Sequence, residues 1–177
     1  PALEHRAAKV GDVVLGVHEL TLPRVDQFGM SINAVSLNVR AGEVVGIAGV
    51  SGNGQAELIK AVSGETRLAA RDNTCIRMKG QPIGTLRPSG RRAAGLAFVP
   101  EDRLGRGAVP ALSLSGNALL TAPGEKIAPR GMIDFTAVRR LAASIIQQYD
   151  VRCGGPDALA RSLSGGNLQK FIVGRET

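Results

Sequence analysis

Hydrophobic and polar residues alternate along two stretches near the start of the chain. The apolar positions are Val13, Leu15, Val17, Leu20 and Leu22 in the first stretch and Val35, Leu37 and Val39 in the second. Alternation with a period of two is typical of strands that bury only one face. Because the turn-rich residues 23–29 separate the two stretches, we expect two half-buried antiparallel strands that form a small β layer.

Two later runs are apolar without alternation. Residues 44–48 read VVGIA, and residues 95–99 read GLAFV. Short continuous runs of this kind form strands that are buried on both faces of a parallel sheet. We expect both runs to be core strands. A further strand is expected at residues 74–78, a turn at residues 79–82, and a helix that opens at Pro88.

The last third of the chain shows a helical period. The apolar stripe consists of Val138, Leu141, Ala142, Ile145, Ile146 and Tyr149. This spacing predicts an amphipathic helix whose apolar face is packed against the rest of the protein, with Tyr149 at the solvent-exposed boundary of that face. We place the helix in a helical lobe at residues 111–160. Another helix has barely begun when the chain ends at Thr177, so we expect the polypeptide to continue.

The composition restricts the class of protein. The chain has 177 residues, of which 44% are apolar, enough for one packed domain with a small lobe. No apolar run approaches the roughly 18 residues that cross a bilayer. The N-terminus lacks the hydrophobic stretch of a signal peptide, so we expect a cytoplasmic location. Cys75 and Cys153 have no metal-binding spacing and are expected to fill space.

The formal net charge of +7 has two interpretations. The arginines are scattered, and the one tight group is Arg87, Arg91 and Arg92. Aromatic residues make up 3% of the chain, so side chains on which bases could stack are scarce. The charge indicates either a solvated basic face or contact with a nucleotide or an anionic membrane surface.

A glycine-rich turn follows the run at residues 44–48. Gly49, Gly52 and Gly54 crowd this turn, and apolar residues then return at helical spacing. Backbone N–H groups can converge on a phosphate only where no Cβ blocks the approach, and a helix N-terminus attracts the same anion. Against the Walker A pattern G-x-x-x-x-G-K-[ST], Gln55 takes the place of the lysine and Ala56 that of the hydroxyl. The turn is either a phosphate-binding loop or a plain strand-turn-helix corner.

A second motif of the same kind opens the last helix. Ser164, Gly165, Gly166 and Asn167 supply a hydroxyl, two residues without side chains and a helix N-terminus. With LSGGNLQK, FVPED and the glycine loop after GEVVGIAG, the chain resembles the ATP-binding subunits of ABC transporters over essentially its whole length. More narrowly, AGVSGNGQAEL, VPEDR before Gly107, and LSGGNLQKFIVGRE resemble the second, C-terminal nucleotide-binding domain of tandem ATPases for simple-sugar or nucleoside import. In that branch the second loop commonly lacks the lysine.

The resemblance implies a fold and a cofactor. The expected fold is an α/β P-loop core with an N-terminal antiparallel β layer and a helical subdomain, incomplete at its C-terminus. Residues 1–110 would hold the β layer and core, residues 111–160 the helical subdomain, and residues 161–177 the signature motif and the start of its helix. The implied cofactors are ATP and Mg²⁺, bound weakly or not at all by this domain.

The resemblance also assigns site residues. The loop that would wrap the phosphates of a nucleotide consists of Gly49, Val50, Ser51, Gly52, Asn53, Gly54, Gln55 and Ala56. Glu101 stands at the Q-loop position, where the family usually has a Gln that contacts Mg²⁺ or the attacking water; an ordinary solvated carboxylate is the alternative. The signature motif, which closes over the γ-phosphate of ATP on the other domain, is Ser164, Gly165, Gly166 and Asn167.

Several departures from the family pattern affect these roles. The missing lysine removes a positive charge that would stabilise the transition state, and Ala56 cannot hold a metal. We assign no catalytic residue and no metal ligand, since the Walker B Asp, catalytic Glu and switch His are expected beyond Thr177. Phe28 is a candidate to stack on adenine, with a core or loop role as the alternative. Asp102 and Arg103 are expected to pair with each other.

The expected function is to couple ATP binding and hydrolysis to the import of a simple sugar or nucleoside. The partner domain's site would hydrolyse ATP, and the 177 residues alone would have negligible ATPase activity. Expected partners are a second nucleotide-binding domain, transmembrane permease subunits and, indirectly, a periplasmic or lipoprotein solute-binding protein, with no nucleic acid. The protein would lie on the inner face of the cell membrane. The alternatives are a structural module that binds no nucleotide and a nucleic-acid-associated ABC-type ATPase.

Overall fold

The computed structural model describes residues 10–24, 27, 29–122, 124–128 and 131–177, with the backbone alone at residues 125 and 126. The chain divides into two compact units, Pro1–Leu96 and Ala97–Thr177. We call them unit 1 and unit 2 and describe each by itself. The prediction of three ranges that end at residues 110, 160 and 177 stays a prediction.

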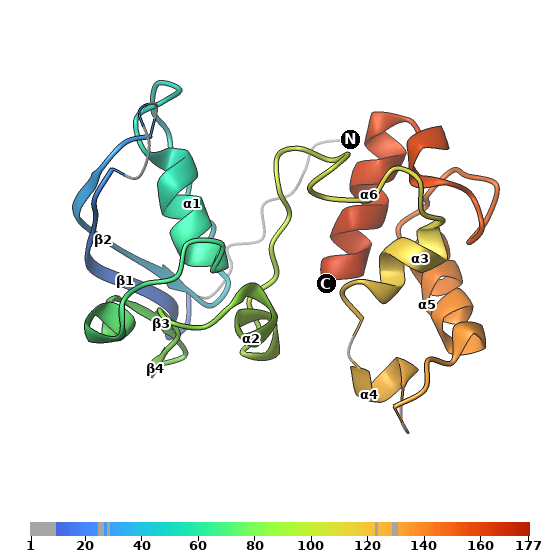
Figure 1. Cartoon of the computed structure of the whole chain (residues 1–177), viewed down its shortest axis with the longest axis horizontal. Helices are drawn as coiled ribbons and strands as arrows, with labels where there is room; N and C mark the ends of the chain where they lie inside the picture. Colours follow the sequence, from blue (N-terminus) through green and yellow to red (C-terminus); the bar gives the residue numbers. More distant parts are fainter. Residues whose placement is uncertain (1–9, 25–26, 28, 123, 129–130) are drawn as a thin grey trace. The chain divides into compact units, whose positions relative to one another are not determined.

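Unit 1 contains an antiparallel sheet of four strands in the order β2-β1-β3-β4 (Figure 1). The strands are β1 (Val13–Leu22), β2 (Ile32–Arg40), β3 (Ile76–Met78) and β4 (Gln81–Pro82). Leu15 lies opposite Val39, and Val17 lies opposite Leu37, so the two alternating stretches form the predicted pair. The expected turn after β3 is shorter than predicted, because residues 81 and 82 pair with β3.

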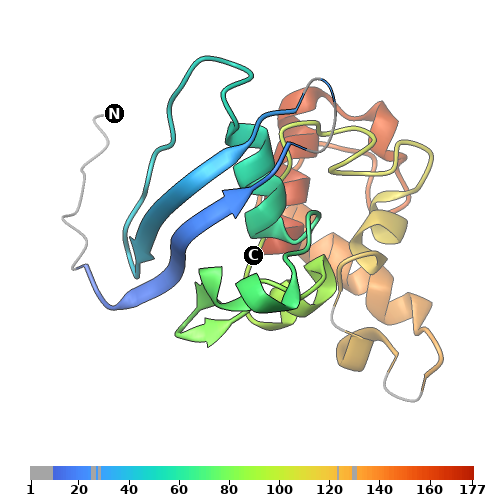
Figure 2. The ribbon, with the colours of Figure 1, turned by 60° about the vertical axis from the view of Figure 1, so that its left-hand side comes forward.

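Helix α1 (Gln55–Ser63) packs beside the β1–β2 pair, as Figure 2 shows. Leu58 and Ala61 of this helix are buried. They belong to one hydrophobic cluster with Val17, Leu20, Ile32, Leu68, Ile76 and Ile83. This packing fixes α1 on the sheet. The glycine-rich turn directly precedes α1 and is positioned by it. The 3₁₀ helix η1 (Ala70–Cys75) leads into β3.

Helix α2 (Pro88–Ala93) begins at Pro88, as predicted, and carries a fully buried arginine. The guanidinium of Arg91 donates to the carbonyls of Ala61, Val62, Gly84 and Leu86. Two of these carbonyls belong to the last turn of α1, where backbone acceptors have no partner within the helix. Burial lowers the pKa of Arg91. Arg91, one of the three arginines of the tight group, therefore contributes to no exposed basic face.

Neither of the two predicted core strands forms. Residues 43–50 have no regular structure, and 96% of Val44 and 74% of Val50 is exposed. Residues 95–99 also lack a strand, and Val99 is exposed. A core strand needs hydrogen-bonding neighbours and cover on its faces. Within the described residues neither run has such a neighbour, so apolar sequence alone does not make it a strand.

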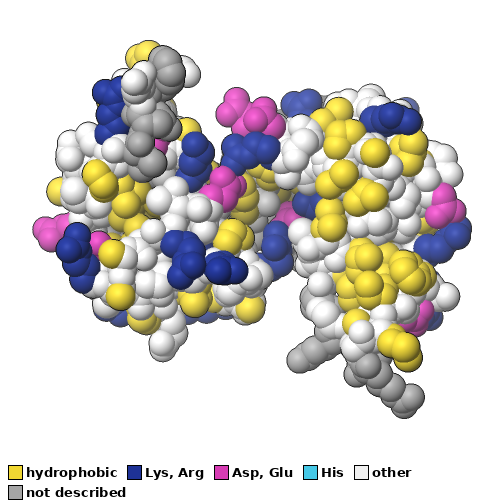
Figure 3. All heavy atoms as spheres, viewed as in Figure 1, with side chains coloured by type: hydrophobic (Ala, Val, Ile, Leu, Met, Phe, Trp, Pro, Cys, Tyr) yellow, Lys and Arg dark blue, Asp and Glu magenta, His cyan; other side chains and the backbone are white. Residues whose placement is uncertain are grey.

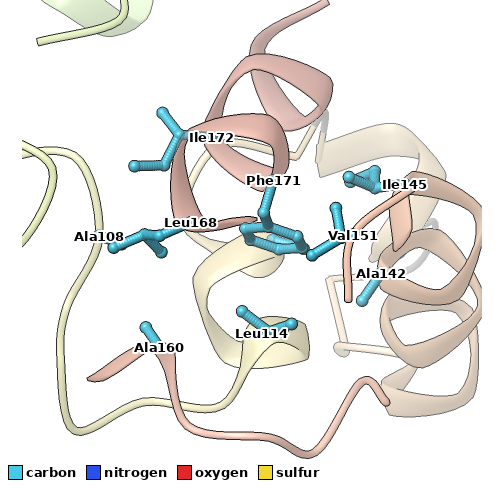
Figure 4. Packing of buried hydrophobic residues seen from close by; sticks show 10 residues of the cluster. Ala108, Leu114, Ala142, Ile145, Val151, Ala160, Leu168, Phe171 and Ile172 are labelled. Carbon is cyan, nitrogen blue, oxygen red and sulfur yellow. The ribbon is translucent and has the colours of Figure 1, made fainter. Parts of the chain in front are cut away.

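Unit 2 is helical and follows the prediction from the apolar period. Its helices are α3 (Leu114–Leu119), α4 (Gly124–Ile127), α5 (Phe135–Gln148) and α6 (Gly165–Glu176), with the 3₁₀ helix η2 (Ala160–Ser162) before α6. On α5 the stripe residues Val138, Ala142 and Ile145 are buried. Phe171 of α6 lies among Leu114, Val151, Ala142 and Ile145 (Figure 4). The core of unit 2 thus fixes α6, the helix that begins with the signature residues, against α3 and α5.

Asn117 of α3 holds the segment before that helix in place. Its carboxamide is fully buried; the oxygen accepts from the N–H of Val109, and the nitrogen donates to the carbonyls of Val109, Leu112 and Ser113. Because a buried amide loses stability when its partners are missing, these bonds fix residues 109–113 to α3. The chain that leads out of the Glu101 region is therefore anchored in unit 2.

Hydrophobic side chains are visible on the surfaces of both units (Figure 3). Large apolar residues that are exposed include Val44 and Val50 in unit 1 and Met132 and Phe135 in unit 2. Within the described residues, none of the helices combines the length and the apolar composition needed to cross a bilayer.

Candidate functional site

The glycine-rich turn before α1 exposes its main chain. Gly52 and Gly54 have φ angles of 88° and 96°, a conformation that favours glycine. A Cβ at Gly52 would meet no atom within 4 Å. The N–H of Asn53 donates to the carbonyl of Val50 at 3.2 Å, which closes the turn. Gly54 is the N-cap of α1, and no side chain of the described residues caps that helix end. The first-turn N–H groups of α1 therefore remain available to an anion.

Gln55 folds back over this turn. Its side-chain nitrogen Nε2 donates to the carbonyl of Val50 at 3.2 Å. The carboxamide also lies against Gly49, at a place where a Cβ on Gly49 would collide with it. Ser51 and Ala56 are exposed beside the turn. The side chain in the lysine position is thus a neutral donor held above the loop.

Two pockets of unit 1 border the turn and the start of α1. A pocket of about 430 Å³ is lined by residues of the turn together with the apolar side chains of Ile32, Val35, Leu37, Ile47 and Leu58. A second pocket, of about 700 Å³, is lined by Glu57 and Lys60 of α1, Met30, and residues 66–69 among others. Glu57 connects the helix to the segment between β1 and β2, because its Oε1 accepts from the N–H of Met30 at 3.4 Å. The volumes are typical of small-molecule sites.

The turn fits a phosphate group better than it fits a metal ion. Its open main chain and uncapped helix end suit an anion. By contrast, residues 49–56 offer no charged side chain, and Ala56 offers no oxygen ligand. Among the described residues there is no group of three or more His, Cys, Asp or Glu side chains that could hold a metal. Phosphate oxygens could bind here through N–H groups, with Mg²⁺ lacking its usual hydroxyl.

Glu101 begins an exposed loop of unit 2 that packs on α6. Within the loop the N–H of Gly107 donates to the carbonyl of Asp102 at 2.9 Å, and the N–H of Ala108 donates to that of Arg103 at 2.7 Å. Gly107 is buried, and a Cβ there would lie 2.9 Å from Cδ1 of Ile172. Glycine at this position therefore lets the loop approach the helix closely.

Arg103 does not pair with Asp102, so that prediction is wrong. Among the residues that the structure describes, no carboxylate forms an ion pair with Arg103. Its Nη1 atom lies 2.7 Å from the position that a Cβ on Gly165 would take. Since Gly165 has no side chain, the guanidinium can rest on the first residue of α6.

The signature residues form the exposed N-terminus of α6. Ser164 is the N-cap, and its Oγ accepts from Nδ2 of Asn167 at 3.0 Å. As an acceptor in this bond, the hydroxyl keeps its own proton for donation elsewhere. Ser164, Gly165 and Gly166 are exposed, whereas Asn167 is half-buried. Within the described part of unit 2, the N–H groups of Gly165 and Gly166 find no acceptor. The helix end therefore presents a hydroxyl and two amides.

Asn167 and Lys170 fasten this helix end to the residues that follow α5. The Oδ1 atom of Asn167 accepts from the N–H of Arg152 at 2.9 Å. The Nζ atom of Lys170 donates to the main-chain carbonyl of Asp150 at 3.0 Å and to its carboxylate at 3.1 Å. The hydrogen bond from Lys170, with the positive charges of Lys170 and Arg152, lowers the pKa of Asp150. These contacts hold the signature residues in a fixed orientation.

Sequence reasoning found both glycine motifs but missed the side chains that the fold brings to them. The glycine turn lies in unit 1, and Glu101 lies with the signature residues in unit 2. The approach of Arg103 to Gly165 was not predicted. Gly107, which follows Asp102 and Arg103 in the sequence, could have indicated a tight loop at this place. Phe28, the candidate for adenine stacking, lies outside the described residues.

Comparison with known protein families matches residues 32–176 to the ABC transporter family. The chain is 37% identical over 174 residues to the nucleoside import ATP-binding protein NupA of Lactococcus lactis subsp. cremoris, covering 98% of this chain and 34% of that protein. It is 40% identical over 175 residues to the guanosine import ATP-binding protein NupO of Bacillus subtilis, covering 98% of this chain and 33% of that protein. The chain spans about a third of the length of these curated relatives.

Solved structures show the same fold. The ADP conformation of MJ1267, an ATP-binding cassette of an ABC transporter, superimposes with a TM-score of 0.65 over 93% of this chain and 64% of that one, at 19% identity. The ATP-binding cassette MJ0796, in a dimeric post-hydrolysis state bound to ADP and Pi, gives a TM-score of 0.65 over 92% of this chain and 68% of that one, at 16% identity. The predicted ABC-type fold class is therefore confirmed, although its two core strands do not form here. The chain belongs to the ABC transporter family, and the relatives that it matches over nearly all of its length are ATP-binding proteins of sugar and nucleoside import.

Proposed function

We propose that this chain is a nucleotide-binding domain of an ABC importer, which couples ATP binding and hydrolysis to the uptake of a simple sugar or nucleoside. The observation that carries the proposal is the pair of exposed helix N-termini, one behind Gly52 and Gly54 and one at Ser164. Relatives named for import of nucleosides, guanosine and ribose support the choice of solute class. When bound, ATP would supply the phosphoanhydride bond whose hydrolysis drives transport.

The two helix ends have different roles in this proposal. The turn at residues 49–56 binds the phosphates of a nucleotide weakly, because Gln55 donates a hydrogen bond without adding charge. Ser164, Gly165 and Gly166 donate their hydroxyl and amides to the γ-phosphate of ATP on a partner nucleotide-binding domain. Glu101 serves as the Q-loop residue of this domain. The absence of a hydroxyl at Ala56 supports weak Mg²⁺ binding here.

The rest of the assembly follows from the same proposal. The chain acts on the inner face of the cell membrane, with transmembrane permease subunits and a partner nucleotide-binding domain. A periplasmic or lipoprotein solute-binding protein acts indirectly by delivering the solute. The 177 residues alone have negligible ATPase activity, since the partner domain carries the hydrolysing site. The pocket of about 700 Å³ that is lined by Glu57 and Lys60 offers room for the base and sugar of the nucleotide.

A structural module that binds no nucleotide is the second candidate, favoured by Gln55 and Ala56. Calorimetric titration of the chain with Mg·ATP separates the two. We expect a dissociation constant near millimolar for the natural chain and at least a tenfold tighter one for Gln55→Lys, because a charged donor roughly doubles the strength of a phosphate contact. Lys79→Gln, which removes a charge far along the chain from the loop, is the control. No saturation by either the natural chain or Gln55→Lys would favour the structural module.

A further inference from the structure

The loop at residues 102–108 is built against the signature helix at two points. Gly107 lies on Ile172, where a Cβ would approach the Ile172 side chain to 2.9 Å and the carbonyl of Arg103 to 2.8 Å. Arg103 lies on Gly165, at the N-terminal end of the same helix. Each contact depends on a glycine, one in the loop and one in the helix. The backbone of Arg103 is therefore held in a fixed place relative to α6.

The guanidinium of Arg103 is in an electrostatically unfavourable position for an empty helix end. The N-terminus of a helix carries about half a positive charge, which favours anions and repels cations. Yet Arg103 rests on the first residue of α6 and, within the described residues, has no carboxylate partner. Ser164 beside it is exposed and has a proton free to donate. An anion between these groups would remove the repulsion.

We propose that Arg103 is an additional ligand of the γ-phosphate that the signature motif contacts, supplied by this chain to the nucleotide of the partner domain. The inference rests on the proposed function of Ser164–Gly166 and adds a residue to it. A guanidinium matches phosphate geometry with two parallel N–H donors. The phosphate would stand between Arg103 on one side and the Ser164 hydroxyl and α6 amides on the other. The arginine stabilises charge that develops on the transferred phosphoryl group.

Gly165 has a second reason to lack a side chain under this proposal. A helix N-terminus needs open amides to bind an anion, and here the same missing Cβ also gives Arg103 its place. Gly165→Ala would displace the guanidinium, because the added Cβ would lie 2.7 Å from Nη1. Gly166 has nothing within 4 Å of its Cβ position, so Gly166→Ala leaves Arg103 where it is. The two glycines therefore differ in their effect on Arg103: an added side chain displaces the guanidinium at position 165 and not at position 166.

The test uses the intact ATPase that carries this chain together with its partner domain. Steady-state ATP turnover and ADP affinity are measured for Arg103→Met, Arg103→Lys and Ser164→Ala. Arg140→Met, at an exposed arginine of α5, is the matched control. We expect Arg103→Met to lower kcat at least tenfold with ADP affinity unchanged, and Arg103→Lys to recover part of the loss. If Arg103 served only to hold the helix end in place, Arg103→Lys would not restore the rate, because an amine cannot reproduce the packing of the guanidinium on Gly165.

The outcomes separate this inference from the function on which it rests. Wild-type turnover in Arg103→Met, with turnover lost in Ser164→Ala, overturns the role of Arg103 and leaves the signature role intact. Wild-type turnover in both variants overturns the proposed function itself. If Arg103→Met does not fold, Arg103→Lys is measured in its place: a kcat below that of the natural protein supports the role of Arg103, and an equal kcat overturns it.

Discussion

At the scale of single residues, several contacts depend on the absence of one side chain. Gly174 of α6 is the clearest case outside the site, because a Cβ there would lie 2.8 Å from Cγ and Cε2 of the Tyr149 ring. Tyr149 is half-buried against the core of unit 2, and its hydroxyl lies 2.5 Å from that of Thr177. The glycine therefore fixes how closely α5 approaches α6, and with it the position of the signature helix.

The Gly174 contact predicts that the effect of Gly174→Ala on the free energy of unfolding depends on whether the Tyr149 ring is present. In the natural chain, Gly174→Ala should lower the free energy of unfolding by about 1 to 3 kcal/mol, the usual cost of overpacking. With Tyr149→Leu the ring is gone, and Gly174→Ala should become neutral or stabilising by up to about 1 kcal/mol, since alanine favours helix. Urea denaturation of the four proteins measures the cycle. Equal effects of Gly174→Ala in both backgrounds would contradict the contact.

The bond between Lys170 and Asp150 predicts a pH effect. Lys170 and Arg152 favour the ionised carboxylate, so the pKa of Asp150 lies below its ordinary value of about 3.9 in the folded chain. Its contribution to stability is therefore present above the unfolded pKa and is lost as the pH falls through the folded pKa. Lys170→Met should raise the Asp150 pKa towards the ordinary value, and Arg140→Met should not. Carboxyl-carbon NMR titration reports both, and an unchanged pKa in Lys170→Met would disprove the link.

At the scale of elements, helices were predictable from the sequence and core strands were not. The stripe of α5 and the Ser164 cap of α6 are decided by neighbours three or four residues away, and both appear in the structure. The run at residues 44–48 has the composition of a core strand, but its state depends on partners distant in sequence. The contacts of Arg91 and Arg103 also depend on tertiary approach, so local patterns could not reveal them.

Arg91 joins α1 to α2, so its removal should weaken unit 1 as a whole. Arg91→Met leaves the carbonyls of Ala61 and Val62 without their donor, at a cost of about 1 to 3 kcal/mol for each unsatisfied group. We expect a loss of about 3 kcal/mol or more in urea denaturation. Arg87→Met, at an exposed arginine just before α2, should change stability by less than about 0.5 kcal/mol. A similar loss in both variants would contradict the role of Arg91.

At the scale of the whole molecule, unit 1 and unit 2 each have a hydrophobic core, and the segment of unit 1 that leads into the glycine turn contributes no residue to either core. Residues 43–50 are exposed and outside the four-stranded sheet. The turn is thus positioned by α1, which is packed, and not by a preceding strand. This arrangement makes the loop the least restrained part of the proposed nucleotide site and agrees with weak binding.

Hydrogen exchange tests this difference along the chain. Amides at residues 44–48 should exchange at nearly the rate of an unfolded peptide, because no acceptor holds them within the described structure. Amides of β1, which lies between β2 and β3, should be protected by the sheet. Mass spectrometry of the 177-residue chain resolves the two segments. Protection of residues 44–48 equal to that of β1 would show that a core strand forms after all.

The proposed role of Ser164 and the two glycines that follow it is to complete the ATP site of a partner domain. Steady-state ATP turnover of the intact ATPase with Ser164→Ala tests it, with Ser113→Ala as control, since Ser113 caps α3 in the same way by accepting from the N–H of Gly116. Both changes remove one helix cap, at a cost to stability of about 1 kcal/mol. We predict at least a tenfold fall in kcat for Ser164→Ala and no comparable fall for Ser113→Ala. Equal turnover in Ser164→Ala and the natural protein would contradict this role of Ser164.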